Sequence, residues 1–196
     1  MKKGMELDSR IGKGRFLNAG VGFGGSCLPK DVLALATKAK ELGIKPRMLE
    51  ATLTINEEQY LEIIALIKKA LKDLKGKKIA VLGLAFKPGT DDMREARSQI
   101  IINALIKEGA KIYAYDPKAI NNAKKIFGNE INYAEKPQDA LTNADACVIV
   151  TEWPEFSNPK LYKCMRGKVI IDGRRMLNPR DIPSDFKYYA IGFPIS

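Results

Sequence analysis

The sequence predicts an α/β protein in which an all-α segment with a long helix precedes a parallel-sheet domain. Before residue 75, apolar residues recur at intervals of three and four positions, which indicates amphipathic helices. After Gly76, short apolar runs alternate with helical patterns, and this β-α-β order is typical of a parallel sheet with helices on both faces. The second part is therefore expected to be a Rossmann-like, doubly wound domain.

The first domain is predicted over residues 1–75, as part of a helical dimerisation domain that carries a glycine loop. Residues 29–42 form a helical pattern with proline in its first turn and Gly43 after its end. A longer helix is predicted over residues 47–74 and would be about 40 Å long. A helix of this length either connects two domains as a core helix or forms a dimer interface, and the pattern favours neither.

The second domain is predicted over residues 76–196. Its expected elements, in chain order, are a strand at 79–84, a helix at 95–107, a strand at 111–115, helices at 118–127 and 137–143, and strands at 146–151, 169–172 and 188–191.

The charge balance limits the classes of partner. The chain has 33 Lys and Arg residues against 23 Asp and Glu residues, a formal net charge of +10, which suits nucleic acid, an anionic membrane or small anions. The lysines are dispersed among acids, without an arginine-rich block or zinc-finger spacing. We therefore expect a nucleotide or phosphate ligand and no nucleic acid. No apolar run approaches the roughly 18 residues of a membrane span, so we expect a cytoplasmic protein without membrane contact.

The absence of histidine limits the chemistry. It removes histidine acid–base catalysis and most zinc sites, so we expect no metal, and reactions must use Cys, Lys, Asp, Glu or Tyr. The three cysteines, Cys27, Cys147 and Cys164, are widely spaced, as in a reducing compartment. Cys147 falls in a predicted buried strand and is expected to be inert.

Residues 20–31, GVGFGGSCLPKD, combine a glycine loop with a cysteine. The loop neither follows a predicted strand nor contains the Gly-Lys-Ser/Thr of a P-loop, so it matches neither phosphate-binding fingerprint. It ends in Cys27 just before a helix, whose dipole favours a thiolate. Lys30 adds positive charge, and Asp31 follows one helical turn later, where it can position a water or a proton. We interpret Cys27 as a nucleophile; the alternative is a glycine-rich turn with a packed cysteine.

Three motifs occur in the order in which one enzyme family carries them. Residues 16–31, FLNAGVGFGGSCLPKD, resemble the active-site signature of the UDP-glucose/GDP-mannose dehydrogenases. Residues 79–98, IAVLGLAFKPGTDDMREARS, resemble the start of that family's C-terminal domain, and residues 170–177, IIDGRRML, its arginine motif. The resemblance extends over essentially the whole chain. Phe23 and the second motif favour the UDP-glucose members over the GDP-mannose members, which remain the closest alternative.

The resemblance implies a two-step, NAD-dependent oxidation of the sugar C6 alcohol, from UDP-glucose to UDP-glucuronate. It implies that Cys27 attacks the intermediate aldehyde to form a thiohemiacetal, which is oxidised to a thioester. Asp31 matches the aspartate that helps to activate the hydrolytic water. The nicotinamide takes up the hydride.

Further contacts are implied residue by residue. Arg10 matches an arginine that reaches into the neighbouring subunit's site, although its spacing to Phe16 is one residue longer than usual. Cys27 and Arg94 match residues that contact NAD. The residues implied to bind the nucleotide sugar are Asn18, Ala19, Gly20, Val21, Gly22, Phe23, Gly24, Phe86, Lys87 and Arg174.

Several of these residues also have a structural interpretation. Lys87 can be a solvated loop lysine, and Arg174 can pair with a nearby acid. Asp116 and Asp172, each at the end of a predicted strand, can be helix N-caps. Asp116 also stands where a dinucleotide-binding domain holds a ribose, but residues 83–86, GLAF, are not the glycine fingerprint. We therefore expect no NAD at this strand.

The family's N-terminal NAD-binding domain has no counterpart in the 26 residues before Cys27, and neither have its catalytic lysine and asparagine. We therefore expect a fragment that holds part of the central domain and the whole C-terminal domain, without the main NAD-binding domain. Such a chain would not oxidise the sugar alone. We expect a homodimer through helix 47–74; the alternative is a non-catalytic, dimerising module that binds nucleotide sugars.

Overall fold

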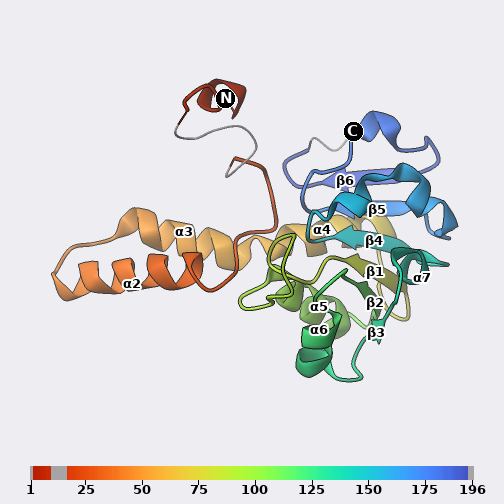
Figure 1. Ribbon diagram of the computed structural model, residues 1–196, viewed down its shortest axis with the longest axis horizontal. Coiled ribbons are helices and arrows are strands. Elements are labelled where there is room, and N and C mark those ends of the chain that lie inside the picture. The colour runs from red at the N-terminus through yellow and green to blue at the C-terminus, as the bar shows by residue number, and fades with distance from the viewer. Residues whose placement is uncertain (1, 10–16, 194–196) are drawn as a thin grey trace.

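The computed structural model describes residues 2–9 and 17–193, and Figure 1 shows a two-helix arm that extends from a sheet domain. The helices are α1 (Lys2–Met5), α2 (Leu28–Glu41), α3 (Arg47–Glu58), α4 (Tyr60–Leu71), α5 (Arg97–Lys107), α6 (Ile120–Phe127) and α7 (Pro137–Leu141). The strands are β1 (Lys78–Leu82), β2 (Lys111–Tyr115), β3 (Asn132–Tyr133), β4 (Ala146–Ile149), β5 (Val169–Asp172) and β6 (Lys187–Ala190). Short 3₁₀ helices cover Pro154–Ser157, Pro159–Cys164 and Pro179–Asp181.

The arm consists of α2 and α3, which lie side by side (Figure 1). The proline in the first turn of α2 needs no backbone N–H there, and Gly43, at a φ of +73°, allows the chain to leave the helix. Among helical residues, α2 buries only Ala36 and α3 only Asn56. The arm therefore has almost no core of its own.

The long helix predicted over residues 47–74 is present but bent. A turn at Gln59 separates α3 from α4, and the helix ends at Leu71 rather than at residue 74. Buried isoleucines and Leu66 on α4 pack in the same core as Ile79 and Ile171 of the sheet. The second half of the bent helix therefore belongs to the sheet domain, whereas the first half extends into the arm.

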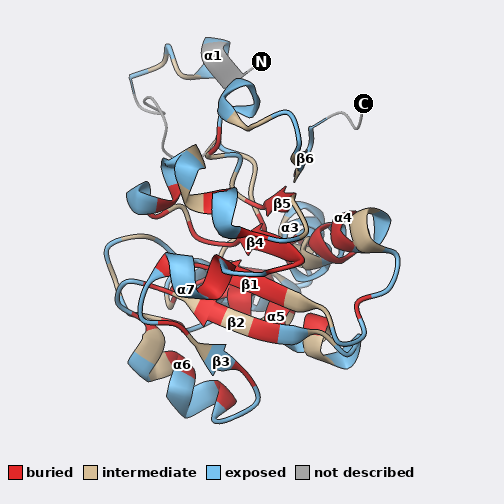
Figure 2. Ribbon diagram, turned by 90° about the vertical axis from the view of Figure 1, so that its right-hand side faces the viewer, coloured by how far each residue is buried: buried red, intermediate tan, exposed pale blue. Residues whose placement is uncertain are grey.

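The sheet has six parallel strands in the order β3-β2-β1-β4-β5-β6, so the predicted doubly wound α/β domain is confirmed. Alternate residues of the central strand β1 enter different cores, as the two-residue period of a strand requires. Ile79 and Val81 pack with α4, α5 and α6. Ala80 and Leu82 pack with α7 and the 3₁₀ helices on the other face. Figure 2 shows that buried positions, in red, are concentrated in the strands of the sheet.

The carboxyl ends of the parallel strands meet at one edge of the sheet, where ligands bind in this class of fold. The glycine loop crosses this edge, since the side chain of Val21 is buried in the core beside Ile63 and a Cβ on Gly173 would lie 2.6 Å from its Cγ1. The loop thus lies between the arm and the sheet. Within the described ranges, no helix is long and apolar enough to cross a bilayer.

Candidate functional site

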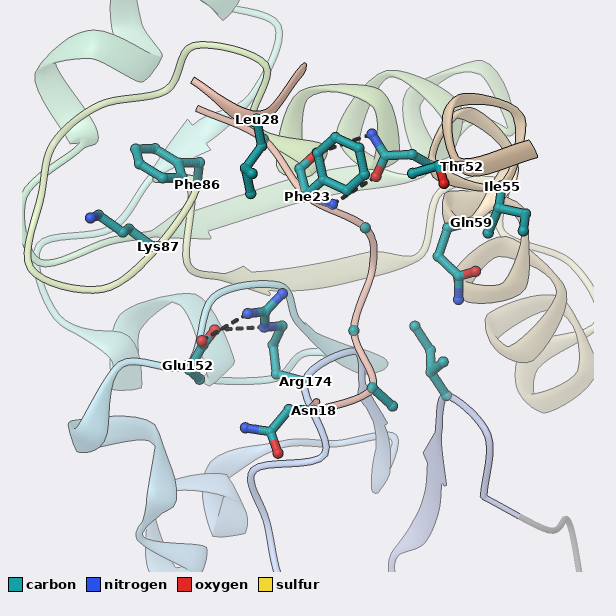
Figure 3. A pocket seen from close by; sticks show the side chains of 16 residues that line it. Asn18, Phe23, Leu28, Thr52, Ile55, Gln59, Phe86, Lys87, Glu152 and Arg174 are labelled. Atoms are coloured by element: carbon teal, nitrogen blue, oxygen red, sulfur yellow. Dashed lines mark hydrogen bonds and ion pairs between the residues drawn. The ribbon is translucent and has the colours of Figure 1, made fainter. Parts of the chain in front are cut away.

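A pocket of about 720 Å³ opens where the glycine loop, the bent helix and the carboxyl edge of the sheet meet (Figure 3). Thr52, Ile55, Asn56 and Gln59 of the bent helix line one side, and Glu152 and Ile191 come from the sheet edge. The predicted substrate-binding residues that line it are Asn18, Ala19, Gly20, Gly22, Phe23, Gly24, Phe86, Lys87 and Arg174.

Among the described residues with a predicted role, four do not belong to this lining: Val21, Cys27, Asp31 and Arg94. Val21 is 2% exposed and packs in the sheet-domain core, so its side chain anchors the loop instead of facing a ligand. Arg10 lies outside the described residues.

Two glycines of the loop, Gly22 and Gly24, lie so close to their neighbours that no side chain would fit at these positions. Gly22 has a φ of +103°, and a Cβ there would lie 2.5 Å from Oδ1 of Asn56. A Cβ on Gly24 would collide with the carbonyl oxygen of Glu95. Because glycine permits both the positive φ and the close approach, the loop can lie flat on the surface that supports it and expose its backbone to the pocket.

Arg174 forms an ion pair inside the pocket. Its Nε lies 2.6 Å from Oε2 of Glu152, and its second terminal nitrogen donates to Oε1 at 2.7 Å (Figure 3). Asp172, which is fully buried, accepts from the backbone N–H groups of Arg174 and Leu177 and from the Tyr188 hydroxyl. These bonds close the loop after β5, so the guanidinium is held at the pocket. The pairing with a nearby acid that the sequence left open does occur, and it occurs in the site.

Asp116, at the end of β2, is a buried acceptor for the loop that carries Phe86 and Lys87. One carboxylate oxygen accepts from the N–H groups of Leu84 and Ala85 at 2.7 and 3.1 Å, and from the Trp153 indole at 3.0 Å. The other accepts from the N–H groups of residues 118 and 119. The carboxylate that would hold a ribose is thus engaged by protein donors, and the glycine fingerprint is missing. This strand end does not fit a dinucleotide.

Cys27 lies at the N-cap position of α2, exposed, at the end of the glycine loop. Its Sγ is 3.8 Å from Oγ of Ser26, and its carbonyl accepts from the N–H of Asp31 at 2.8 Å. The Asp31 carboxylate is 66% exposed and pairs with Lys30 at 3.3 Å. The thiol and the carboxylate therefore stand one helical turn apart at the open start of the arm.

Arg94 lies beside this thiol. Its carbonyl accepts from the N–H of Gly25 at 2.8 Å, and its guanidinium binds the Asp92 carboxylate. Hydrogen bonding to Asp92, together with the negative charge of that carboxylate, raises the pKa of Arg94. The side chains of Arg94 and Cys27 are both exposed to solvent.

The other two cysteines differ from Cys27. Cys147 is fully buried in β4, and desolvation raises the pKa of its thiol well above the usual value, which agrees with the inert thiol that we expected. Cys164 is exposed at the end of a 3₁₀ helix.

Asn56 and Glu152 were missed by the sequence reasoning. Asn56 is a polar residue in an otherwise amphipathic helix, and Glu152 follows β4 at the carboxyl edge of the sheet. The second position carried a usable signal, because side chains just after parallel strands face this edge. For Asn56 no local pattern distinguished a buried asparagine from a solvated one.

Both parts of the chain match known proteins. The model for the UDP-glucose/GDP-mannose dehydrogenase family, UDP binding domain, matches residues 80–179, and that for the family's central domain matches residues 1–58. The chain belongs to this family. Its members are NAD-dependent nucleotide-sugar dehydrogenases, and the chain comprises the central and UDP-binding parts of such an enzyme.

Similar proteins are named for one activity within this family. The chain is 46% identical over 176 residues to UDP-glucose 6-dehydrogenase AglM of Haloferax volcanii, covering 89% of this chain and 40% of that protein. It is 42% identical over 195 residues to UDP-glucose 6-dehydrogenase TuaD of Bacillus subtilis, covering 97% and 42%. The structure of a UDP-glucose dehydrogenase from Pyrobaculum islandicum superposes with a TM-score of 0.84 at 36% identity, covering 96% and 42%. The chain thus spans less than half the length of these relatives.

Proposed function

We propose that this chain supplies the nucleotide-sugar site and the thiol nucleophile of a UDP-glucose 6-dehydrogenase, which oxidises UDP-glucose to UDP-glucuronate. One observation carries the proposal. The glycine loop, the Phe86-Lys87 loop and Arg174 line a single pocket, and the loop leads directly to Cys27. The names of the relatives at 42–46% identity support UDP-glucose as the substrate.

The pocket offers groups that suit a sugar diphosphate. Arg174 presents a planar guanidinium and Lys87 a mobile ammonium, and both cations bind phosphate oxygens through charge-assisted hydrogen bonds. The glycine backbone can approach the ligand closely. Phe23 and Phe86 add apolar surface beside these polar groups.

The thiol is assigned the covalent step. The Cys27 sulfur forms a bond to the C6 carbon of the aldehyde intermediate, and the carbonyl oxygen takes up a proton, which gives a thiohemiacetal. Bound NAD⁺ would supply the hydride acceptor both for oxidation of the C6 alcohol to the aldehyde and for oxidation of the thiohemiacetal to a thioester. In the second oxidation C6 loses a hydride and its hydroxyl group loses a proton. Water adds to the resulting thioester, the carbon–sulfur bond breaks, and the carboxylate and the free thiol are released. We assign the orientation of that water to Asp31, whose backbone N–H is bonded to the Cys27 carbonyl one turn earlier in the chain.

Binding of UDP-glucose by the chain tests the proposal. Calorimetry should detect binding, and Arg174→Ala and Lys87→Ala should each weaken it about tenfold, as loss of a charge-assisted hydrogen bond predicts. Lys160→Ala removes an exposed lysine outside the pocket and should leave the affinity unchanged. No heat and no thermal shift at millimolar UDP-glucose would overturn the proposal.

The thiol can be tested separately by alkylation. In a Cys164→Ser background, iodoacetamide should label the exposed Cys27, and the buried Cys147 should stay unlabelled until the protein unfolds. UDP-glucose should slow the labelling of Cys27 because the sugar would cover it. Labelling at a rate independent of a bound sugar would separate the thiol from the substrate site.

The alternatives are a GDP-mannose 6-dehydrogenase part and a non-catalytic module that binds nucleotide sugars. The ratio of the affinities for UDP-glucose and GDP-mannose, measured by competition, decides between the first alternative and our proposal. Cys27→Ala in the complete enzyme decides the second, because it should abolish NADH formation from UDP-glucose if the thiol is the nucleophile.

We also propose that a second copy of the chain covers the arm. Of the twelve large hydrophobic side chains that the described residues expose, seven lie on the arm or on the turn that joins its helices: Leu28, Leu33, Leu35, Leu42, Ile44, Met48 and Ile55. Such a concentration of exposed apolar residues is typical of an interaction surface. Because α4 packs its buried face, Ile63, Ile64, Leu66 and Ile67, on the sheet domain, the homodimer expected through helix 47–74 is now proposed through α2 and α3 alone.

A further inference from the structure

The side chain of Asn56 holds the glycine loop by forming hydrogen bonds to both backbone polar groups of Phe23. The N–H of Phe23 donates to Oδ1 of Asn56 at 2.7 Å, and Nδ2 of Asn56 donates to the carbonyl of Phe23 at 3.2 Å. The dashed lines at Phe23 in Figure 3 mark this pair of bonds. An amide side chain has one donor group and one acceptor, so it complements a backbone residue in the way that a neighbouring strand does.

The clamp is tight and largely hidden from solvent. Asn56 is only 4% exposed, and a Cβ on Gly22 would lie 2.5 Å from its Oδ1. The glycine before Phe23 is therefore what lets the loop come within hydrogen-bonding distance of the helix. Without Asn56, the N–H and the carbonyl of Phe23 would lose their partners in a partly buried place, which is costly.

Arg97, at the start of α5, binds the backbone of Asn56. Its side chain is 3% exposed, and it donates to the backbone carbonyl of Asn56 at 3.3 Å. It also forms ion pairs with Glu57 at 3.6 Å and with Glu95 at 3.7 Å. The residues of the bent helix are thereby tied to the segment whose backbone supports Gly24.

We propose that Asn56 is a positioning residue for the nucleotide-sugar loop: its clamp on Phe23 sets where the loop backbone and Cys27 stand relative to the bound sugar. This inference rests on the proposed function. Gly22, Phe23 and Gly24 line the pocket around the clamp, and Cys27 follows four residues after Phe23. A displaced Phe23 peptide would therefore move both the binding surface and the nucleophile, and rates depend steeply on such geometry.

A measurement without ligand tests the clamp itself. Hydrogen exchange by mass spectrometry on the peptide covering residues 17–27 should show loss of protection in Asn56→Ala. Asn132→Ala is the matched control, because it removes an asparagine hydrogen bond to the backbone carbonyl of Ile112, at 3.2 Å, away from the pocket. It should leave the loop protected. Equal protection of the loop in wild type and Asn56→Ala would overturn the proposal, whatever the ligand results are.

A second measurement tests positioning against mere stability. Asn56→Ala should weaken UDP-glucose binding at least about tenfold, whereas Asn132→Ala should change it less than about twofold. Asn56→Asp keeps the acceptor for the Phe23 N–H and loses the donor, so its affinity should fall between those of wild type and the alanine variant. Loss of thermal stability in Asn56→Ala with unchanged affinity would overturn the proposal. Failure of the wild type to bind UDP-glucose would instead refute the proposed function, and the exchange measurement would still decide whether the clamp exists.

The complete enzyme provides a third measurement. Asn56→Ala should lower kcat as well as raise KM, because a displaced Cys27 affects the chemical step in addition to binding. A rise in KM alone would show that Asn56 supports binding only, and would overturn the part of the proposal that concerns the nucleophile.

Discussion

The arm and the sheet domain place their apolar residues in opposite ways. Every residue of β4 and β5 is buried, whereas among helical residues α2 and α3 bury one each. The sheet domain therefore has a core that can stabilise it alone, and the arm presents leucines and isoleucines to solvent. The candidate site lies at the junction, where a rigid edge of strands meets helices that we propose to be covered by a second copy.

The bent helix, which was predicted as one element, has buried apolar residues in one half and exposed apolar residues in the other. Its α4 half contributes Ile63 and Ile67, each 0% exposed, to the sheet-domain core. Its α3 half exposes Met48 and Ile55 at 85% and 62%. We therefore propose that the boundary between the two domains falls at Gln59 rather than at residue 75.

The largest expected effect comes from the core of the sheet domain. Ile101→Ala removes a fully buried side chain and should lower the free energy of unfolding by about 2–5 kcal/mol. The same substitution at Ile44, which is 60% exposed between α2 and α3, should change it by less than about 0.5 kcal/mol. Urea unfolding at dilute concentration measures both. Equal losses would show that the arm has a core of its own and would remove the contrast.

A buried acid should come next. Asp116→Ala leaves the N–H groups of Leu84 and Ala85 and the Trp153 indole without their acceptor, which should cost on the order of 3 kcal/mol. UDP-glucose binding should weaken too, because the loop with Lys87 loses its support. Asp181→Ala, in an exposed 3₁₀ helix, is the control. Thermal unfolding and calorimetry provide the readouts, and wild-type affinity in Asp116→Ala would show that this loop needs no such support.

A charge introduced on the arm should weaken dimerisation and leave the stability of the monomer unchanged. Leu35→Glu puts a charge on the exposed face of α2 and should weaken dimerisation at least about tenfold, or 1.4 kcal/mol, without changing the melting temperature of the monomer. Ile126→Glu, on exposed α6 surface, should leave association unchanged. Sedimentation velocity over a concentration series measures this. A wild type that stays monomeric at high concentration would contradict the proposed dimer.

The smallest effect concerns one ion pair at the amino edge of the sheet. Burial raises the pKa of Asp145, but hydrogen bonds from the Arg166 guanidinium at 2.6 Å and from the Lys78 N–H lower it by more. The net pKa therefore lies below its usual value. A carboxyl with a lowered pKa stabilises the fold above its unfolded pKa, and this stabilisation is lost as the pH falls through the folded value.

Arg166→Ala should accordingly lower the free energy of unfolding at pH 7 by less than about 1 kcal/mol, since Arg166 is largely exposed. The loss should disappear in acid, once Asp145 is protonated. Urea unfolding at neutral and acid pH checks this, with Arg180→Ala as the control. A loss that is the same at both values would point to packing by the arginine stem instead of charge.

Local sequence patterns predicted most of the sheet domain. The strands at 111–115 and 169–172 have the predicted bounds, because each is a short run of apolar residues bounded by polar or turn residues. β3 was missed, since two residues at the sheet edge leave no periodic signal. The bend at Gln59 was missed as well, because the helical period continues through it and only packing separates the two halves.

The sequence by itself determined the alternating order that makes a parallel sheet, the glycines that let a loop lie flat, and a cysteine at the start of a helix. Periodicity, backbone freedom and helix dipoles act over a few residues, so a single chain displays them. Tertiary structure alone decided which polar groups meet: Asn56 with Phe23, 33 positions apart, and Arg174 with Glu152, 22 positions apart. Those pairs depend on how the bent helix and the loops after the strands approach one another in space. A local sequence pattern cannot predict this approach, because the partners are far apart in the chain.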